Sequence, residues 1–390
     1  MLLLKNILRA PGMLLLSLVA AIYRLYSRQR VWLISDRIMQ AGDNGEALFR
    51  YLNDKKVSDE DRYYFIVSNR SACYSRMKEI GRVVNFNSFK HRLLFVASDF
   101  ILSSHYEKHI THPFSRFWMR FWRRRLRFKF IFLQHGVIKD DMSDVFNGRH
   151  DIDMFVTSSQ REYESVSKYD LAKGVVKLTG LPRYDYLENN PENEIVVAPT
   201  HRLYLLSNKV SRLGKRGYSS EFRDTEYFKF YNRLINDERL LAAMKEKGMR
   251  GKFILHPLLS NQIEDFQDNE HFTLCGSGSY GQLLSGGNVW VSDYSSATFD
   301  FAYLGKPVVY AQFDRDRFRK EHTYRPGYFD YEKDGFGPVC YDYESTVREM
   351  LLLIKGGCNT AETYRQRSRL FFAYHDRRNC ARVYDSIVSL

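Results

Sequence analysis

Short apolar runs recur along the first half of the chain, and longer segments with mixed polar and apolar positions lie between them. The runs are RVWLIS (30–35), RYYFIVS (62–68), VVNF (83–86), FILSSH (100–105), FIFLQHG (130–136), DMFVTSS (153–159) and VVKLTG (175–180). Strands that alternate with helical segments are typical of βαβ units and a parallel sheet. We therefore predict an α/β domain over residues 30–186.

A polar stretch with a proline, LENNPENE, follows this series and is typical of a linker. The alternation then restarts with IVVAPTHR (195–202), KFILHPLL (252–259), HFTLCG (271–276), NVWVSDYSS (288–296), PVVYAQF (307–313) and PVCYDY (338–343). These runs predict a second α/β domain over residues 195–375 and a C-terminal helix over 376–390. Ligands bind beyond the carboxyl ends of the strands in open parallel sheets. We therefore expect two Rossmann-like domains that face a central cleft.

The N-terminal segment contains one apolar run, at about residues 13–23, which is followed by Arg24, Arg28 and Arg30. A spanning helix needs about 20 apolar residues, so this run is short. We predict that residues 1–29 form a membrane-associating helix that lies in the interface on the cytoplasmic face of the membrane. A tilted single span and a helix packed on the fold are the alternatives. The five scattered cysteines favour a reduced, cytosolic setting.

A net charge of +13 favours an anionic partner. Much of the positive charge lies in SRFWMRFWRRRLRFKF, residues 115–130, where arginines alternate with large aromatic residues. Such a segment suits single-stranded nucleic acid, a membrane interface over anionic lipid, or a solvated basic helix. Because the N-terminal segment favours the membrane, we predict that residues 115–130 contact an anionic membrane surface and that no nucleic acid binds.

Two histidines end apolar runs, one in each half of the chain. His135 and Gly136 follow the strand-like run of FLQHGVIKDD, and His256 ends the run in LHP. A strand-end histidine suits a general base near neutral pH, and a neighbouring glycine lets other groups approach. A histidine that is hydrogen-bonded at a strand end is the alternative. One histidine from each domain would suit a proton on one side and a phosphate on the other.

The motif VSDYSSATFDFAYLGKP places Ser295 and Ser296 between an apolar run and a helical segment. Free N–H groups at a helix start attract anions, so two hydroxyls there suit a diphosphate. Plain helix capping is the alternative.

Three further motifs carry polar groups next to predicted strands or helices. In APTHR, Thr200 and Arg202 are positioned to reach a phosphate, since arginine offers a planar, permanent charge. In GLPRYD, we expect a structural ion pair of Arg183 and Asp185. In AGDNGEALF, Asp43 is expected to cap a helix.

No zinc-ligand spacing, Walker loop, GxGxxG fingerprint or GxSxG elbow occurs in the sequence. These absences argue against an NTPase, a Rossmann dehydrogenase and a serine hydrolase. We predict that the protein requires no metal and no cofactor.

Six motifs share an order with one known family: FLQHGVIKDD, GLPRYDYL, APTHR, LHP, SDYSSATFDFAYLGKPVVY and GPVCYD. From about residue 30 to 385 the chain resembles the CDP-glycerol glycerophosphotransferases, the teichoic-acid primases and polymerases with their capsule-building relatives. The resemblance implies a GT-B-like fold, with an acceptor-side domain over 30–186 and a CDP-alditol-binding domain over 195–375.

The resemblance also implies an activity, namely transfer of glycerol phosphate from CDP-glycerol to a hydroxyl of a membrane-linked acceptor with release of CMP. By motif, His135 resembles the general base, His256 the phosphate-contacting histidine, and Ser295 with Ser296 the diphosphate-binding pair. Motifs associated with donor binding contain three more residues, Thr200, Arg202 and Asp300.

Two positions depart from the family pattern. His201 stands in APTHR where Trp or Phe is more usual, and Arg377 stands where glycine is expected. The alternatives to the implied activity are a ribitol-phosphate transferase that uses CDP-ribitol, a GT-B glycosyltransferase that uses a nucleotide sugar, and a binding protein with an inactive transferase fold, which would be a membrane-associated, nucleic-acid-binding or assembly factor.

Overall fold

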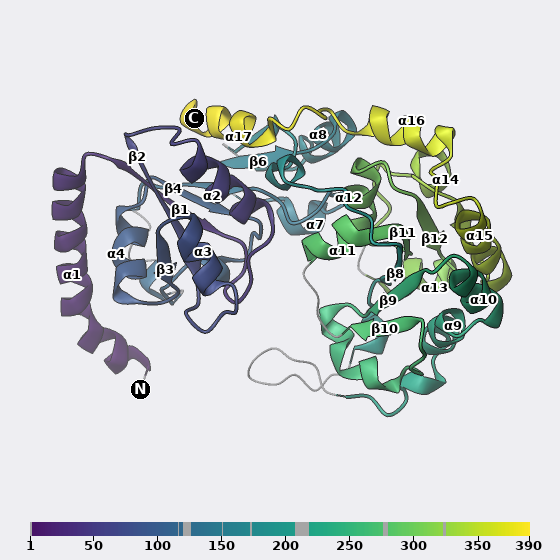
Figure 1. Ribbon diagram of the computed structural model, residues 1–390. Helices are drawn as coiled ribbons and strands as arrows, with labels where there is room; N and C mark the ends of the chain where they lie inside the picture. The colour runs from purple at the N-terminus through teal and green to yellow at the C-terminus, as the bar shows by residue number, and fades with distance from the viewer. Residues whose placement is uncertain are drawn as a thin grey trace. The chain divides into compact units, whose positions relative to one another are not determined.

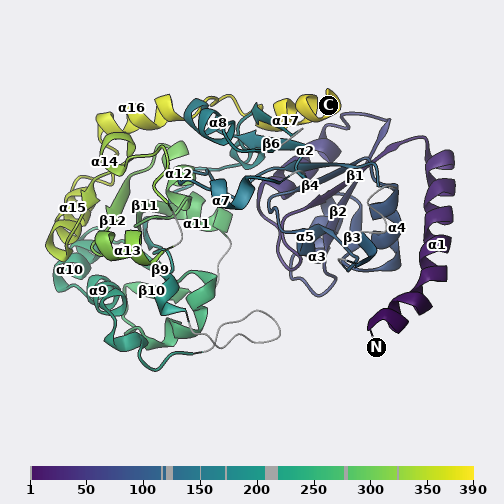
Figure 2. The same cartoon turned by 180° about the vertical axis from the view of Figure 1, so that it is seen from behind.

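The computed structural model describes residues 2–115, 117–119, 126–149, 151–171, 174–206, 218–275, 280–322 and 325–390. The chain forms two compact units (Figures 1 and 2). The first unit comprises Met1–His135, Val145–Tyr186 and Ala373–Leu390, and the second comprises Gly136–Asp144 and Leu187–Phe372. The chain therefore leaves the first unit directly after His135 and returns to it for its last residues.

The first unit is built on a seven-stranded sheet with the order β3-β2-β1-β4-β5-β6-β7. Its strands are β1 (Arg30–Ser35), β2 (Asp61–Val67), β3 (Val83–Asn85), β4 (Phe100–Ser103), β5 (Lys129–Phe132), β6 (Met154–Thr157) and β7 (Val175–Leu178). Each pair of neighbouring strands is parallel. The central strands are buried on both faces, which is why they read as continuous apolar runs in the sequence.

One long helix precedes the strands of the first unit, and the other helices lie between or after the strands. They are α1 (Leu2–Ser27), α2 (Asn44–Asp54), α3 (Tyr74–Ile80), α4 (Phe89–Ala97), α5 (Lys108–Thr111), α7 (Ser143–Phe146), α8 (Gln160–Val166), the 3₁₀ turn η1 (Pro182–Asp185) and α17 (Asn379–Val388). Asp43 accepts a hydrogen bond from the backbone N–H of Asn44 at 2.8 Å, so the predicted cap of α2 is confirmed.

The second unit contains a six-stranded parallel sheet with the order β10-β9-β8-β11-β12-β13. Its strands are β8 (Glu194–Val197), β9 (Arg250–Ile254), β10 (Phe272–Cys275), β11 (Gly287–Ser292), β12 (Val308–Ala311) and β13 (Val339–Cys340). Its helices are α9 (Glu226–Ile235), α10 (Glu238–Glu246), α11 (Tyr280–Gly286), α12 (Ala297–Tyr303), α13 (Arg315–Glu321), α14 (Tyr331–Asp334), α15 (Tyr343–Lys355) and α16 (Glu362–Phe371), with 3₁₀ turns η2 (Leu203–Leu205), η3 (Phe222–Asp224) and η4 (Pro257–Asp265).

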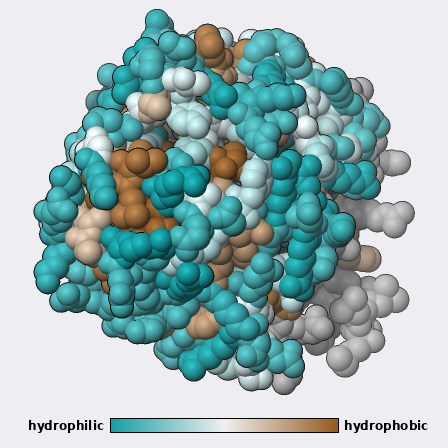
Figure 3. All heavy atoms as spheres, turned by 90° about the vertical axis from the view of Figure 1, so that its right-hand side faces the viewer, coloured by the Kyte–Doolittle hydropathy of each residue, from teal (hydrophilic) through white to brown (hydrophobic). Residues whose placement is uncertain are grey.

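The predicted α/β class with two parallel sheets is confirmed, since every apolar run named for the two domains overlaps one of these strands. The boundaries 30–186, 195–375 and 376–390, their acceptor and donor roles, and the central cleft stay predictions. The face seen in Figure 3 is mostly hydrophilic, with hydrophobic side chains gathered in small areas.

Helix α1 packs one face on α4 of the same unit (Figure 1). Leu16 and Ala20 are buried there against Val96 and Ala97. Among the described residues, no helix has the length and apolar character needed to cross a membrane. The membrane-associating role of residues 1–29 is therefore not shown by the structure and stays a prediction.

The predicted membrane contact over residues 115–130 falls partly outside the described residues, which omit 116 and 120–125, and it stays a prediction. Within that segment, Trp118 is buried and packs with the cluster between α1 and α4, whereas Phe117 is half exposed.

Candidate active site

His135 lies three residues beyond the end of β5, at the carboxyl edge of the first sheet. Gln134, which precedes it, is buried and adopts a left-handed backbone conformation with φ of 63°. This conformation turns the chain out of the strand direction, and the side chain of His135 is 57% exposed. The sequence prediction of a histidine delivered to this edge is therefore met by the backbone geometry.

Asp43 binds the imidazole of His135. The Nδ1–H of His135 donates a hydrogen bond to Oδ2 of Asp43. Although burial alone would raise the pKa of Asp43, the charges of His135 and Arg183 hold that pKa well below its usual value. A carboxylate that stays ionised fixes the proton of His135 on Nδ1 and leaves Nε2 with its lone pair. The arrangement is that of a general base oriented by a carboxylate.

Arg183 and Asn44 hold this pair in place. One guanidinium nitrogen of Arg183, Nη1, donates to Oδ1 of Asp43 at 2.7 Å and to the carbonyl oxygen of His135 at 2.7 Å. The amide of Asn44 donates to the carbonyl oxygen of Gln134 at 2.8 Å and accepts from the backbone N–H of Arg183 at 3.0 Å. Both side chains are buried, so the loop that carries His135 is fixed from two sides.

The predicted ion pair of Arg183 and Asp185 is wrong. Asp185 instead accepts hydrogen bonds from the backbone N–H groups of Asn379, at 2.9 Å, and Cys380, at 2.8 Å, at the start of α17. Two residues along a 3₁₀ turn point in different directions, so their proximity in the sequence did not make them partners.

Asp36, the residue after β1, anchors the loop that carries Asp43. Its buried carboxylate accepts from four backbone N–H groups, those of Gly42 at 3.2 Å, Asp43 at 3.0 Å, Gly45 at 2.8 Å and Glu46 at 3.2 Å. A Cβ added to Gly45 would lie 2.5 Å from Oδ1 of Asp36, so this close approach requires glycine. The position of Asp43 is thus set by the end of the neighbouring strand.

His105 and Arg37 complete the surroundings of His135. The rings of His105 and His135 are stacked with centroids 4.6 Å apart. The guanidinium of Arg37 donates from Nε to Nε2 of His105 at 2.9 Å and from Nη2 to Nε2 of His135 at 3.3 Å. Burial, with the neighbouring charges of His135 and Arg37, lowers the pKa of His105 to about 3, so its imidazole is neutral.

Asp43, His105 and His135 are close enough to share a metal ion, the one such group found among the described side chains. Arg37, however, places its positive charge on the Nε2 atoms of both histidines. A second cation would be repelled there, so this set of groups suits a proton and an anion better than a metal.

In the second unit, three neighbouring strand ends carry the predicted donor residues. β9 leads to His256, β8 leads to Thr200 and Arg202, and β11 leads to Ser295 and Ser296. The carboxyl ends of parallel neighbours lie at one edge of the sheet. The backbone N–H of Thr200 donates to Asp293 at 2.9 Å and so connects the β8 and β11 loops directly.

His256 is held by the start of η4. Its Nδ1 accepts a hydrogen bond from the backbone N–H of Leu258 at 3.2 Å, which assigns the ring proton of the neutral form to Nε2. The ring of His201 lies with its centroid 4.3 Å from that of His256, and His322 lies 5.2 Å from His201. Nε2 of His256 is therefore a hydrogen-bond donor at this edge. His201 occupies the family's usual aromatic position as a ring neighbour.

Arg202 is fully buried and surrounded by protein groups. It forms a bidentate pair with Asp314 at 2.7 and 2.9 Å, an ion pair with Asp293 at 2.8 Å, and a hydrogen bond to the carbonyl oxygen of Thr200 at 2.7 Å. These contacts fix the β8 loop. No local pattern marks either acidic partner, and Asp314 lies 112 positions away from Arg202.

The other residues predicted to bind the CDP-alditol donor differ in their hydrogen bonding. Oγ of Ser295 accepts from the backbone N–H of Ala297 at 3.1 Å, whereas the hydroxyl of Ser296 makes no capping bond. The hydroxyl of Thr200 is buried and has no hydrogen-bond partner among the described residues. Asp300 is buried in α12 and accepts from the hydroxyl of Tyr280 at 2.9 Å.

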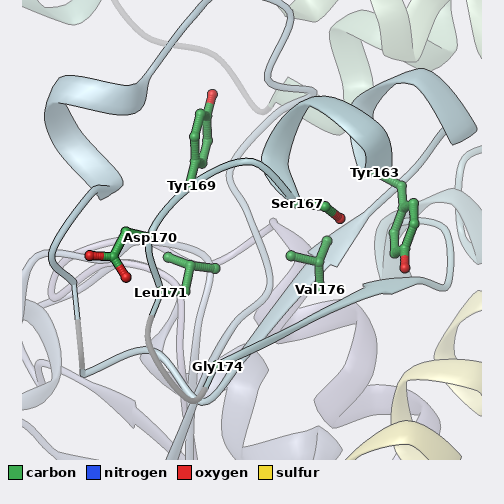
Figure 4. A pocket seen from close by; sticks show the side chains of 7 residues that line it. All are labelled: Tyr163, Ser167, Tyr169, Asp170, Leu171, Gly174 and Val176. Carbon is green, nitrogen blue, oxygen red and sulfur yellow. The ribbon is translucent and has the colours of Figure 1, made fainter.

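A separate cavity of about 270 Å³ lies elsewhere in the first unit. Figure 4 shows its lining, which comes from the end of α8, the following loop and the start of β7. Gly174 precedes β7, so the cavity is at the amino edge of the sheet, whereas His135 is at the carboxyl edge.

One protein-family model matches nearly the whole chain. The model described as CDP-Glycerol:Poly(glycerophosphate) glycerophosphotransferase matches residues 17–389. The chain belongs to this glycerophosphotransferase family. The resemblance found in the six motifs is thereby confirmed.

Two proteins of Bacillus subtilis (strain 168) are similar to the chain in sequence. The minor teichoic acid biosynthesis protein GgaB is 36% identical over 382 residues, which are 97% of this chain and 42% of GgaB. The teichoic acid glycerol-phosphate primase is 26% identical over 117 residues, 30% of this chain and 29% of the primase. The chain thus spans about two fifths of the length of GgaB.

Solved structures share the fold. The wall teichoic acid polymerase TagF superposes with a TM-score of 0.64 at 15% identity. The superposition covers 99% of this chain and 96% of the TagF chain. A putative UDP-N-acetylglucosamine 2-epimerase from Listeria monocytogenes gives a TM-score of 0.55 at 12% identity, with 93% and 96% covered. At these identities the likeness concerns the fold alone, and it agrees with the predicted GT-B-like class.

Proposed function

We propose that the protein transfers glycerol phosphate from CDP-glycerol to a hydroxyl group of a membrane-linked acceptor and releases CMP, in the synthesis of a teichoic-acid-like or capsular polymer. The family supports the reaction class. The observation that carries the proposal is the bond from Nδ1 of His135 to Asp43, because it leaves Nε2 at the strand edge as a base.

The proposed reaction is a single displacement at phosphorus. Nε2 of His135 takes the proton of the acceptor hydroxyl while its oxygen attacks the phosphorus that bears the glycerol. A new P–O bond forms, the P–O bond to the bridging oxygen breaks, and CMP leaves with the electron pair. The imidazolium that forms is stabilised by the carboxylate of Asp43, and general-base catalysis of this kind is worth roughly 10²–10⁴-fold in rate.

The donor diphosphate is assigned to the second unit. Nε2–H of His256 and the hydroxyls of Ser295, Ser296 and Thr200 are the proposed donors of hydrogen bonds to its oxygens. Such bonds strengthen as negative charge collects on the leaving CMP. The proposed step uses no metal ion and no organic cofactor.

Arg202 and Asp300 have different parts in this proposal. Both are fully buried, and the guanidinium of Arg202 is bonded to Asp293 and Asp314. We therefore assign these residues to positioning the loops that bind the donor, instead of to direct contact with its phosphates.

Transfer of ribitol phosphate from CDP-ribitol is the second candidate. A teichoic acid ribitol-phosphate primase from Bacillus spizizenii (strain ATCC 23059 / NRRL B-14472 / W23) is 23% identical over 211 residues, 54% of this chain and 52% of that primase. Both donors carry the same CDP group, so the residues assigned to the diphosphate serve either one. A nucleotide-sugar donor is the third candidate, and the similarity of fold to an epimerase keeps it in the test.

The outer face of α1 supports a location at the cytoplasmic face of the membrane, as a peripheral or monotopic protein. Opposite the side packed on α4, the helix exposes large apolar side chains, namely Leu14, Leu15, Leu18, Ile22, Leu25 and Tyr26. An amphipathic helix with such a face lies in the interface of a bilayer, and a net charge of +13 favours anionic lipid.

The proposed function is tested by nucleotide release from the detergent-solubilised protein with a membrane extract as the acceptor source. CDP-glycerol, CDP-ribitol and UDP-N-acetylglucosamine are offered in parallel. We expect CMP from CDP-glycerol. CMP from CDP-ribitol alone would select the second candidate, release of a uridine nucleotide would select the third, and no release from any donor by the folded protein would contradict all three.

A further inference from the structure

Arg37 is hydrogen-bonded to Nε2 of His135, the atom that accepts the proton in the proposed reaction. It lies two residues after β1, and a pair of backbone hydrogen bonds with Gln40, at 3.1 and 3.4 Å, holds it in a tight turn. From this turn its guanidinium reaches Nε2 of His105 at 2.9 Å and Nε2 of His135 at 3.3 Å. The lone pair that would accept the proton of the acceptor therefore faces an N–H group of Arg37.

Both partners of Arg37 are imidazole nitrogens that accept its hydrogen bonds. His135 donates its Nδ1–H to Asp43, so its Nε2 carries the lone pair that accepts from Arg37. Nε2 of His105 accepts as well, which requires the neutral form of that ring. Among the described residues, no carboxylate forms an ion pair with Arg37. A permanent positive charge at a half-buried position thus has two imidazoles as hydrogen-bond acceptors and no anion.

We propose that Arg37 binds a phosphate group of the acceptor, and that this contact withdraws its guanidinium from Nε2 of His135. The inference rests on the proposed function. The acceptor is then a molecule whose reactive hydroxyl lies a few bonds away from a phosphate, such as the free end of an alditol phosphate unit. Arg37 is then a residue that selects the acceptor and uncovers the base.

The geometry favours this exchange for a phosphate and opposes it for a neutral sugar. Hydrogen bonds of a guanidinium to a phosphate are charge-assisted and typically about 2.7–2.9 Å long, shorter and stronger than the 3.3 Å contact to His135. A phosphate therefore replaces the hydrogen bond that Arg37 loses when its guanidinium leaves His135. A neutral hydroxyl has to displace the same N–H without such a replacement.

The catalytic test compares two synthetic lipid-linked acceptors, one disaccharide without phosphate next to its free hydroxyls and the same disaccharide extended by one glycerol phosphate. The full chain is assayed for CMP release as wild type, Arg37→Gln, Arg37→Lys and Arg82→Gln. Arg82 is an exposed arginine that directly precedes β3, at the amino edge of the same sheet, and serves as the matched control.

We expect the wild type and Arg82→Gln to prefer the phosphate-bearing acceptor in kcat/KM. Arg37→Gln should lower this preference at least about tenfold, because one charge-assisted contact is lost. Arg37→Lys should keep part of it, since the charge remains without the planar fork. An unchanged preference in Arg37→Gln, with circular dichroism showing a folded protein, overturns the inference.

A second measurement does not depend on turnover. Nitrogen-15 NMR of the histidine rings follows Nε2 of His135 while inorganic phosphate is added. We expect a saturable shift in the wild type that is absent in Arg37→Gln and retained in Arg82→Gln. If no variant releases CMP but the shift requires Arg37, the proposed function fails and the phosphate site stands. A shift that persists in Arg37→Gln, or is absent from the wild type, overturns the site even if the transferase is active.

Discussion

Asp43 accepts a hydrogen bond from Nδ1 of His135, although the two residues lie 92 positions apart in the chain. Asp43 stands at the start of α2, and His135 stands beyond the end of β5. Parallel strand order brings β1 and β5 to either side of β4, so the loops that follow β1 and β5 meet at one edge. This relationship fixes the orientation of the His135 imidazole, which the proposed role as general base requires.

Replacing Asp43 by asparagine is predicted to lower kcat for CMP release by roughly 10²–10⁴-fold, because an amide neither stabilises the imidazolium nor fixes the tautomer. The pKa of Asp43 is held well below its usual value, so its carboxylate is ionised throughout the working range and the defect should persist from pH 6 to 9. Asp54→Asn, at the exposed opposite end of α2, is the control. Equal kcat values for the two variants would remove Asp43 from the mechanism.

The buried histidine His91 predicts how stability depends on pH. Its Nδ1 accepts from the backbone N–H of Asn87 at 3.0 Å and its Nε2 bonds to the carbonyl oxygen of Thr111 at 3.1 Å. Burial lowers the pKa of His91 to about 3 from the ordinary 6.5. Between these values the unfolded chain binds more protons than the folded one, so the free energy of unfolding falls as the pH is lowered.

From pH 7 to 5, wild type should therefore lose about 2 kcal/mol more of its free energy of unfolding than His91→Gln. Urea unfolding of both proteins at several pH values measures the difference. Because the comparison concerns slopes, any constant destabilisation of the variant cancels, as do the other titrating groups. Parallel pH profiles would show that His91 is not kept neutral by the fold.

The exposed face of α1 predicts membrane binding. Leu18 is 58% exposed on that face, so Leu18→Glu should leave the fold intact and weaken binding to vesicles that contain anionic lipid. Burial of one leucine in the bilayer is worth about 1.5–3 kcal/mol, so its loss corresponds to about a ten- to hundredfold change in vesicle affinity. Leu352→Glu, at 59% exposure on α15, is the matched control. Vesicle flotation with equal recovery of both variants would argue against the α1 face as the membrane contact.

The backbone conformation at Arg377 explains why glycine is expected at this position in the family pattern. Its φ is 54°, in the left-handed region where a side chain costs about 1–2 kcal/mol and where glycine is favoured. Arg377→Gly should therefore unfold at a temperature equal to or above that of the wild type, whereas Arg377→Val should unfold lower. Thermal unfolding followed by circular dichroism tests this order. A lower melting temperature for the glycine variant would show that contacts of the arginine outweigh the strain.

The sequence predicted the strands well because parallel strands buried on both faces appear as unbroken apolar runs. It also placed His135 and His256, since each ends such a run. The partners of these residues escaped prediction. Asp43 carried only the signal of a helix cap, a role it fulfils, and nothing local marked it as the partner of a histidine far along the chain.

Arg202 shows a second limit of local sequence patterns. An arginine after a strand reads as a phosphate ligand, but the fold buries it between Asp293 and Asp314. The charge balance of a buried group is a tertiary property that a strand-end motif does not reveal. Arg37 was missed for the same reason, because its significance comes from two histidines on neighbouring strand ends.

The proposed role of His135 is tested most directly by the rate of CMP release from CDP-glycerol by His135→Ala, measured with saturating donor and membrane extract beside wild type and His109→Ala. His109 is an exposed histidine of the same unit and controls for loss of an imidazole. We predict a fall of roughly 10²–10⁴-fold for His135→Ala and a rate near that of wild type for His109→Ala. A His135→Ala protein that is folded and releases CMP as fast as the wild type would contradict the assignment of His135 as the base.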